Sequence, residues 1–117
     1  MTGDDRRVRG RLVFGPDVSP FVDATLYVRI EDVGRADAPS RIVAEQVMHH
    51  VTWAPGRSLE FNIQGALPAG STYCQLRVHV DVDGDGAISP GDYVSTESHP
   101  VMQPGGDTSL EVRVHRV

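Results

Sequence analysis

The stretch YCQLRVHV, residues 73–80, decides the fold class of this chain. Its apolar and polar residues alternate strictly, which is the pattern of a β-strand with one buried face and one solvated face. The apolar positions are Cys74, Leu76, Val78 and Val80, and the polar positions are Gln75, Arg77 and His79. The sequence therefore predicts an amphipathic strand that ends directly before an acidic loop.

The same alternation recurs along the rest of the chain, at residues 8–14, 24–33, 41–51, 58–63, 93–98 and 109–117. Residues 41–51 also fit helical spacing, but their strand neighbours and poor capping signals favour a strand with a bulge. Seven strands with one solvated face each predict an all-β protein. We expect a seven-stranded antiparallel β-sandwich of the immunoglobulin-like kind or a partly open barrel.

The alternation also predicts which side chains form the core. We expect the arginines of the first strand on its solvated face, where they need no ligand to explain them. The residues expected to point inward outside residues 73–80 are Val8, Leu12, Phe14, Ala24, Leu26, Val28, Ile30, Leu59, Phe61, Ile63, Leu110, Val112 and Val114.

Composition limits the possible classes of function. The chain has 117 residues, of which 39% are hydrophobic and 23% are charged. This composition is typical of one soluble globular domain. We place the domain at residues 7–117, after an N-terminal tail at residues 1–6. The net charge is −5 and all basic residues are arginine, so nucleic-acid binding is not expected. A single cysteine, Cys74, excludes a disulfide or a cysteine zinc site within the chain, and its apolar setting predicts a buried thiol.

The first residues, MTGDDRRVRGRLVF (1–14), lack the apolar run of a signal peptide, and no segment predicts a membrane span. The Arg6–Arg7 pair is followed by alternation rather than by a continuous apolar stretch. The residues leave two possibilities open: a cytoplasmic protein, or one whose leader is not part of this sequence.

The stretch HVDVDGDGAISPGDYVS, residues 79–95, holds four aspartates and three glycines. Numbered from Asp81, it matches the EF-hand loop position by position. Oxygen ligands are expected at positions 1, 3, 5, 7, 9 and 12, which are Asp81, Asp83, Asp85, the Ala87 carbonyl, Ser89 and Asp92. Gly86 at the sixth position permits the sharp turn with positive φ. The spacing predicts a metal site with Ca²⁺ as the cofactor.

Two features differ from an ordinary EF-hand. Asp92 replaces glutamate at the twelfth position, and its shorter side chain predicts weaker binding with closer competition from Mg²⁺. Strands flank the loop instead of helices, so we expect a structural ion and not a sensor. The loop resembles that of dockerin modules, but it lacks their helices. The alternative is a metal-free Asp-Gly turn, which a twelve-residue connection and four clustered carboxylates disfavour.

The five histidines give a weaker signal. His79 and His115 are expected on outward faces as solvated side chains, with a cross-strand metal pair as the alternative. His49 and His50 are adjacent and would face opposite sides of a strand, so they are poorly placed to share an ion.

Trp53 and Tyr27 could form an aromatic platform for a sugar or a peptide, although a single Trp beside a turn more often packs or anchors the loop. The chain shows no Ser-His-Asp order, phosphate loop or nucleotide fingerprint. We therefore do not expect an enzyme.

The chain resembles the YbaY/YscW family of small bacterial envelope lipoproteins in four segments: VRGRLVF (8–14), ATLYVRIEDVGRADAPSRIVAEQV (24–47), SLEFNI (58–63) and YCQLRVHV (73–80). The most specific block is L-x-V-x-I-E-D-V-x-x-A-D-A-P-S-x-I-V-A-E-Q, residues 26–46. The resemblance implies a β-sandwich, an extracytoplasmic location and, in the YscW branch, a pilotin role in assembling a secretion apparatus. The chain departs from the family in having no lipobox, since Cys74 is in mid-strand, and in its long acidic hairpin loop.

Together these observations predict a non-enzymatic calcium-binding module associated with the periplasm or cell envelope, with a protein partner that the sequence does not identify. The alternative is a carbohydrate-binding or adhesive accessory module, with Ca²⁺ or the Trp53 region at its ligand site. An open coordination position beside an aromatic ring would favour the alternative. A closed coordination shell away from any pocket would favour the envelope module.

Overall fold

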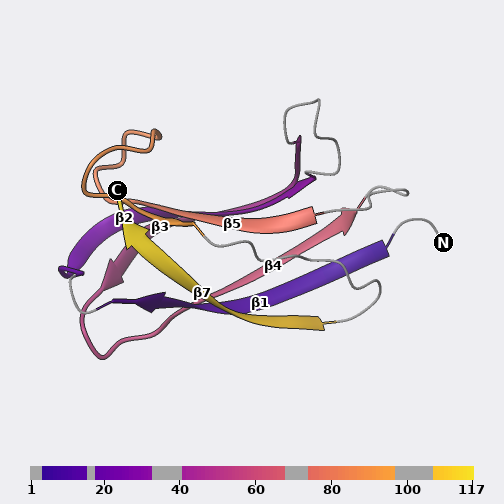
Figure 1. The fold of residues 1–117 in the computed structure, drawn as a ribbon, viewed down its shortest axis with the longest axis horizontal. Helices are drawn as coiled ribbons and strands as arrows, with labels where there is room; N and C mark the ends of the chain where they lie inside the picture. The colour runs from indigo at the N-terminus through magenta and orange to yellow at the C-terminus, as the bar shows by residue number, and fades with distance from the viewer. Residues whose placement is uncertain (1–3, 16–17, 33–40, 68–73, 97–106) are drawn as a thin grey trace.

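The computed structural model describes residues 4–15, 18–32, 41–67, 74–96 and 107–117. Within these ranges the chain forms strands and no helix (Figure 1). The strands are β1 (Asp4–Phe14), β2 (Phe21–Asp32), β3 (Arg41–Trp53), β4 (Leu59–Leu67), β5 (Cys74–Asp81), β6 (Tyr93–Ser95) and β7 (Asp107–Arg116). The seven predicted strands are thus confirmed, and the A-D-A-P turn at 36–39 lies outside the described residues.

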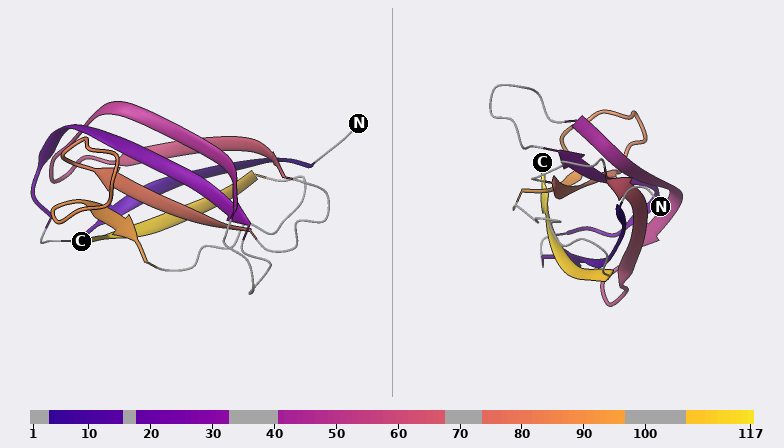
Figure 2. Two further views of the ribbon diagram at one scale, coloured as in Figure 1. Left: turned by 90° about the horizontal axis from the view of Figure 1, so that it is seen from above. Right: turned by 90° about the vertical axis from the view of Figure 1, so that its right-hand side faces the viewer.

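The strands form one sheet with the order β3-β2-β5-β6-β7-β1-β4. The sheet curls until its two edge strands, β3 and β4, approach each other, which gives the nearly closed barrel seen end-on in Figure 2. The partly open barrel is therefore the architecture observed. The first strand begins at Asp4, earlier than the boundary expected at residue 7, because residues 4–6 pair with residues 65–67 of β4.

One strand pair departs from the antiparallel arrangement expected from the sequence. Strands β1 and β7 run parallel, with Gly10 opposite Leu110 and Phe14 opposite Val114, whereas all other described pairs are antiparallel. The odd number of strands explains this pair. Strands β3 and β4 lie at the two edges of the sheet, are joined by the short turn at 54–58 and run in opposite directions. Seven strands in a ring cannot all alternate in direction, so one pair of neighbours must be parallel.

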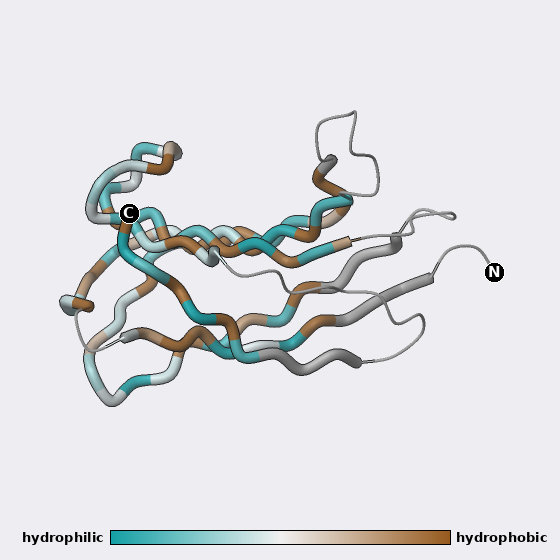
Figure 3. The backbone as a smooth tube through the Cα atoms, in the orientation of Figure 1, coloured by the Kyte–Doolittle hydropathy of each residue, from teal (hydrophilic) through white to brown (hydrophobic). Residues whose placement is uncertain are grey.

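The core consists of the inward residues of the alternating strands. Along β2 the burial alternates as the sequence predicted, with Ala24, Leu26, Val28 and Ile30 fully buried. The tube in Figure 3 shows this as regular changes between hydrophobic and hydrophilic positions along the strands. The thiol of Cys74 is also buried, as expected.

Four aromatic rings close the end of the barrel nearest the acidic loop. Phe14, Phe21, Trp53 and Tyr93 pack with ring centroids between 4.4 and 6.1 Å apart. They come from β1, β2, β3 and β6, so one aromatic cluster joins strands from opposite sides of the sheet. Aromatic pairs at these separations stabilise a fold by more than the burial of their apolar area alone.

The predicted bulge in β3 is confirmed. Pairing between β2 and β3 shifts register at three points, and Asp23 and His50 have positive φ where two of the shifts occur. The His50 Nδ1 atom lies 2.5 Å from Asp23 Oδ1 and links the two irregular positions across the strands. Bulges of this kind increase local twist, which helps a sheet to close.

We predict that Leu26→Ala will lower the free energy of unfolding by about 2–5 kcal/mol, because it leaves a cavity in the core. The side chain is 0% exposed. Urea unfolding measures the effect. The matched control is Val22→Ala on the same strand, where the side chain is 72% exposed. An equal loss in both variants would contradict the assigned core.

Candidate functional site

The acidic loop connects the end of β5 to the start of β6 at one end of the barrel. Asp81 is the last residue of β5, and Asp92 directly precedes β6. Their side chains are 0% and 1% exposed, respectively, although Asp81 lies on the outward face of its strand. The loop folds back over this face and buries both carboxylates at its base. Buried carboxylates require compensation by hydrogen bonds or by a positive charge.

The four aspartates of the loop converge. One carboxylate oxygen from each of Asp81, Asp83, Asp85 and Asp92 can be chosen so that all lie within 4.8 Å of one another. Asp83 and Asp85 are exposed, so the cluster has a buried base and a solvated rim. Four carboxylates this close repel one another strongly in the absence of a cation.

Glycines give the loop its curvature. Gly86 has a φ of 80° and Gly84 a φ of 72°, both in the left-handed region. The positive φ predicted for the sixth loop position is therefore confirmed. At Asp81 the backbone N–H of Gly84 donates to Oδ1 at 3.0 Å, and that of Gly86 donates to Oδ2 at 2.7 Å. The loop backbone is thus wrapped around the Asp81 carboxylate.

The remaining carboxylates also accept hydrogen bonds from the loop. Ser89 Oγ donates to Asp83 Oδ2 at 3.0 Å, and the N–H of Ala87 donates to Asp85 Oδ1 at 3.0 Å. The N–H of Val82 donates to Asp92 Oδ1 at 2.9 Å. Five of the six predicted ligand residues thus contribute a side-chain oxygen to one bonded cluster. Ala87, predicted to offer only its carbonyl, is exposed and joins through its N–H.

The pKa values of Asp81 and Asp83 are shifted in opposite directions. Burial raises the pKa of Asp81, and a hydrogen bond shared with Asp83 raises it further. That same shared bond lowers the pKa of Asp83. Of the two carboxyl groups, the buried Asp81 therefore holds a proton more readily than the exposed Asp83. A divalent cation would supply compensation for both charges.

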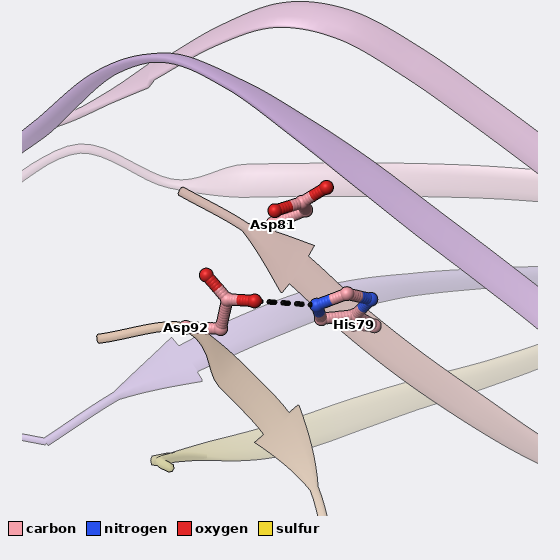
Figure 4. Close-up of side chains that lie close together, drawn as sticks. All are labelled: His79, Asp81 and Asp92. Carbon is pink, nitrogen blue, oxygen red and sulfur yellow. Dashed lines mark hydrogen bonds and ion pairs between the residues drawn. The ribbon is translucent and has the colours of Figure 1, made fainter. Parts of the chain in front are cut away.

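The structure corrects the prediction for His79. Its side chain was expected to be solvated, but it is only 7% exposed. The ring stacks on Tyr27 at a centroid distance of 5.5 Å, and Nε2 lies 2.9 Å from Asp92 Oδ2 (Figure 4). Burial follows because Tyr27 covers one side and the loop covers another. The sequence places His79 and Asp81 two residues apart on one strand face, but this spacing alone does not predict that either side chain is buried.

The other histidines of the described residues, His49, His50 and His115, occupy exposed positions. His79 and His115 both pair with Val94 of the short strand between them, so they are not the direct cross-strand neighbours considered as an alternative. His49 and His50 lie at the bulge of β3, and both are exposed.

Trp53 and Tyr27 do not form one platform. Trp53 is buried in the aromatic cluster, and its Nε1 donates to the Arg57 carbonyl at 2.9 Å, so it anchors the turn at 54–58. The packing role expected for Trp53 is confirmed. Tyr27 lies on the outer face, below the Arg29 guanidinium at 5.1 Å. Because Trp53 is buried and Tyr27 lies on the outer face, the two rings cannot together bind a sugar or a peptide.

Two surface grooves lie outside the carboxylate cluster. The larger, about 710 Å³, borders the edge strands, and its lining includes Arg11, Gln46, Met48, Glu60 and Asn62. The smaller, about 200 Å³, adjoins the acidic loop, and its lining includes Tyr27, Arg77, His79, Ile88 and Val94. None of the four aspartates lines either groove.

Comparisons with known proteins give one structural match. No protein-family model matches the chain, and no curated protein matches its sequence. The fold is similar to a solved structure described as an alternative pilotin from the type II secretion system of Vibrio cholerae. The TM-score is 0.70 at 19% identity, and the match covers 97% of each chain. The two chains share a fold over nearly their whole length. In the described part of this chain, no helix is long and apolar enough to cross a bilayer.

We predict that Gly86→Ala will lower the free energy of unfolding by about 1–2 kcal/mol, because a Cβ disfavours the left-handed backbone there. No atom within 4 Å would clash with that Cβ, so the cost comes from backbone conformation alone. Thermal unfolding with chelator present measures it. Gly15→Ala is the control, since Gly15 is equally open but has no positive φ. Equal behaviour of the two variants would refute the assigned loop geometry.

Proposed function

We propose that this protein is a non-enzymatic, envelope-associated assembly module of the pilotin kind, with a structural Ca²⁺ ion in the loop between β5 and β6. The observation that supports the assembly role is the fold, which this chain shares with the Vibrio cholerae pilotin over 97% of each chain. The resemblance to the YbaY/YscW lipoproteins in sequence supports the same class. The proposed partner is a protein of a secretion apparatus.

The donor set supports calcium as the ion. All the proposed ligands are oxygens, and four of them are carboxylates that converge within 4.8 Å. Hard cations such as Ca²⁺ prefer six to eight oxygen ligands, and this loop offers them at the spacing that Ca²⁺ uses. The residues present therefore fit a calcium ion. Asp81, Asp83, Asp85, Ser89 and Asp92 would hold it through their side chains, and Ala87 would hold it through its carbonyl.

A structural role follows from where the loop lies. Strand β6 has three residues and pairs with β5 at only two positions, His79 with Val94 and Val80 with Tyr93. Beyond them the Val78 N–H donates to Ser95 Oγ instead of to a backbone carbonyl. So short a ladder holds the hairpin weakly. An ion between Asp81 at the end of β5 and Asp92 before β6 would fasten the two strands together.

The proposed location is consistent with the proposed ion. Extracellular calcium-binding modules work at dissociation constants of about 10⁻⁴–10⁻³ M, a range that suits a loop with aspartate at its twelfth position. An envelope compartment exposed to external calcium could fill such a loop without high affinity. The ion would contribute charge compensation and no catalytic group, in keeping with a non-enzymatic module.

We predict that Ca²⁺ at about 100 times its dissociation constant will stabilise the chelator-treated protein by about 2.7 kcal/mol, because it binds only the folded loop. The double variant Asp83→Asn, Asp85→Ala should lose this response and keep its fold, since both side chains are exposed. Calorimetric titration and melting temperature with and without Ca²⁺ measure the two quantities, and Mg²⁺ titration tests selectivity.

Glu60→Gln is the matched control for that experiment. It removes one exposed carboxylate from β4, outside the loop, and should leave the Ca²⁺ response unchanged. Retention of full calcium binding by the double variant would show that the assigned ligands are wrong. A wild-type protein with no binding heat and no thermal shift would exclude the calcium site altogether.

We predict that, in the natural host, the protein will fractionate with the cell envelope and that deletion of its gene will reduce assembly of a secretion complex in the outer membrane. Fractionation and immunoblotting for the assembled complex measure these outcomes, with the wild-type gene restored as the control. A protein found only in the cytoplasmic fraction, or unchanged assembly in the deletion strain, would refute the role.

A further inference from the structure

His79 contacts the candidate calcium site from outside the twelve-residue loop. It lies on β5, two residues before Asp81, and its ring is held between Tyr27 and the hairpin. Figure 4 shows the imidazole beside Asp92, with Asp81 above the pair. Nothing in the spacing of an EF-hand loop requires a histidine here, so its burial against a proposed ligand needs its own explanation.

The direction of the His79–Asp92 hydrogen bond follows from chemistry. As a calcium ligand, Asp92 would carry no proton, so its carboxylate could only accept this hydrogen bond. Nε2 must therefore carry the hydrogen, and it donates to Asp92 Oδ2 across 2.9 Å. A protonated Nε2 has no lone pair to offer a metal. Ligand atoms of His79, Asp81 and Asp92 also lie within 4.8 Å of one another, but the second ring nitrogen points away from Asp92 in Figure 4. His79 would therefore act on the proposed site through Asp92 and not as a ligand.

The two carboxylate oxygens of Asp92 have different hydrogen-bond partners. Oδ2 accepts from His79 Nε2 and from the N–H of Ser89, the latter at 3.2 Å, and it lies 3.5 Å from Ser89 Oγ. Oδ1 accepts one hydrogen bond, from the N–H of Val82 at 2.9 Å. Both oxygens of the Asp92 carboxylate are thus held, one by His79 and the loop and the other by the backbone at the end of β5.

We infer that His79 is a positioning residue for calcium: its Nε2–H holds the Asp92 carboxylate in place beside the other proposed ligands. This inference rests on the proposed calcium site. Hydrogen-bond partners behind a metal ligand typically change metal affinity by about 10- to 100-fold when they are removed.

The test compares two substitutions at one position. His79→Phe keeps a ring against Tyr27 and removes the donor, and should weaken Ca²⁺ binding about 10-fold or more. His79→Gln places an amide N–H at the same number of bonds from the backbone and should restore affinity to within about threefold. His115→Phe, on an exposed histidine that flanks Val94 from the other side, is the control and should bind as wild type does.

A second measurement uses the wild-type protein and so does not depend on the variants folding. Long-range ¹H–¹⁵N spectra of the imidazole report which nitrogen carries the hydrogen. We expect the Nε2–H form of His79 in the Ca²⁺-loaded protein. A spectrum with Nε2 deprotonated or bound to metal would overturn the inference, as would equal Ca²⁺ affinities for His79→Phe and wild type.

Failure of the inference and failure of the proposed site give different results. If wild-type protein binds Ca²⁺ and His79→Phe binds it equally well, the calcium site stands and the positioning role is wrong. If wild-type protein binds no Ca²⁺ by calorimetry, the proposed site itself is wrong and the inference fails with it.

Discussion

The conformation of the β5–β6 hairpin depends on two buried carboxylates, those of Asp81 and Asp92. Both are almost inaccessible to water, and each accepts hydrogen bonds from the backbone of the loop between them. Charge buried in this way destabilises a fold unless it is neutralised. The loop supplies backbone donors and two further aspartates around these groups, and β5 adds the imidazole of His79. Its conformation is therefore organised around negative charge, where an ordinary hairpin would be organised around its turn.

Much of the fold could be predicted because alternation reports directly on burial. Each strand buries one face, so the inward positions of β2 and β5 follow from the sequence alone. The parallel pairing of β1 with β7 could not be predicted in that way. Strand direction depends on the order of strands in the whole sheet, and no local pattern encodes that order.

The candidate site shows the same division between local and tertiary information. The convergence of four carboxylates was predictable, because ligand spacing within one loop is a local property. The role of His79 was not, because alternation assigns it to a solvated face. Tyr27 from β2 and Asp92 from the far side of the loop bury it only once the sheet is formed. Side chains that depend on two distant segments need the structure to reveal them.

The place of β7 has a consequence for how the chain acquires its structure. This last strand lies between β6 and β1, so the first and final segments of the chain are neighbours in the sheet. During synthesis β1 emerges long before β7, so one side of β1 stays unpaired until β7 has emerged. Contacts between such distant segments generally make folding slow. Until β7 pairs with it, that edge of β1 is a site at which the chain is prone to aggregate.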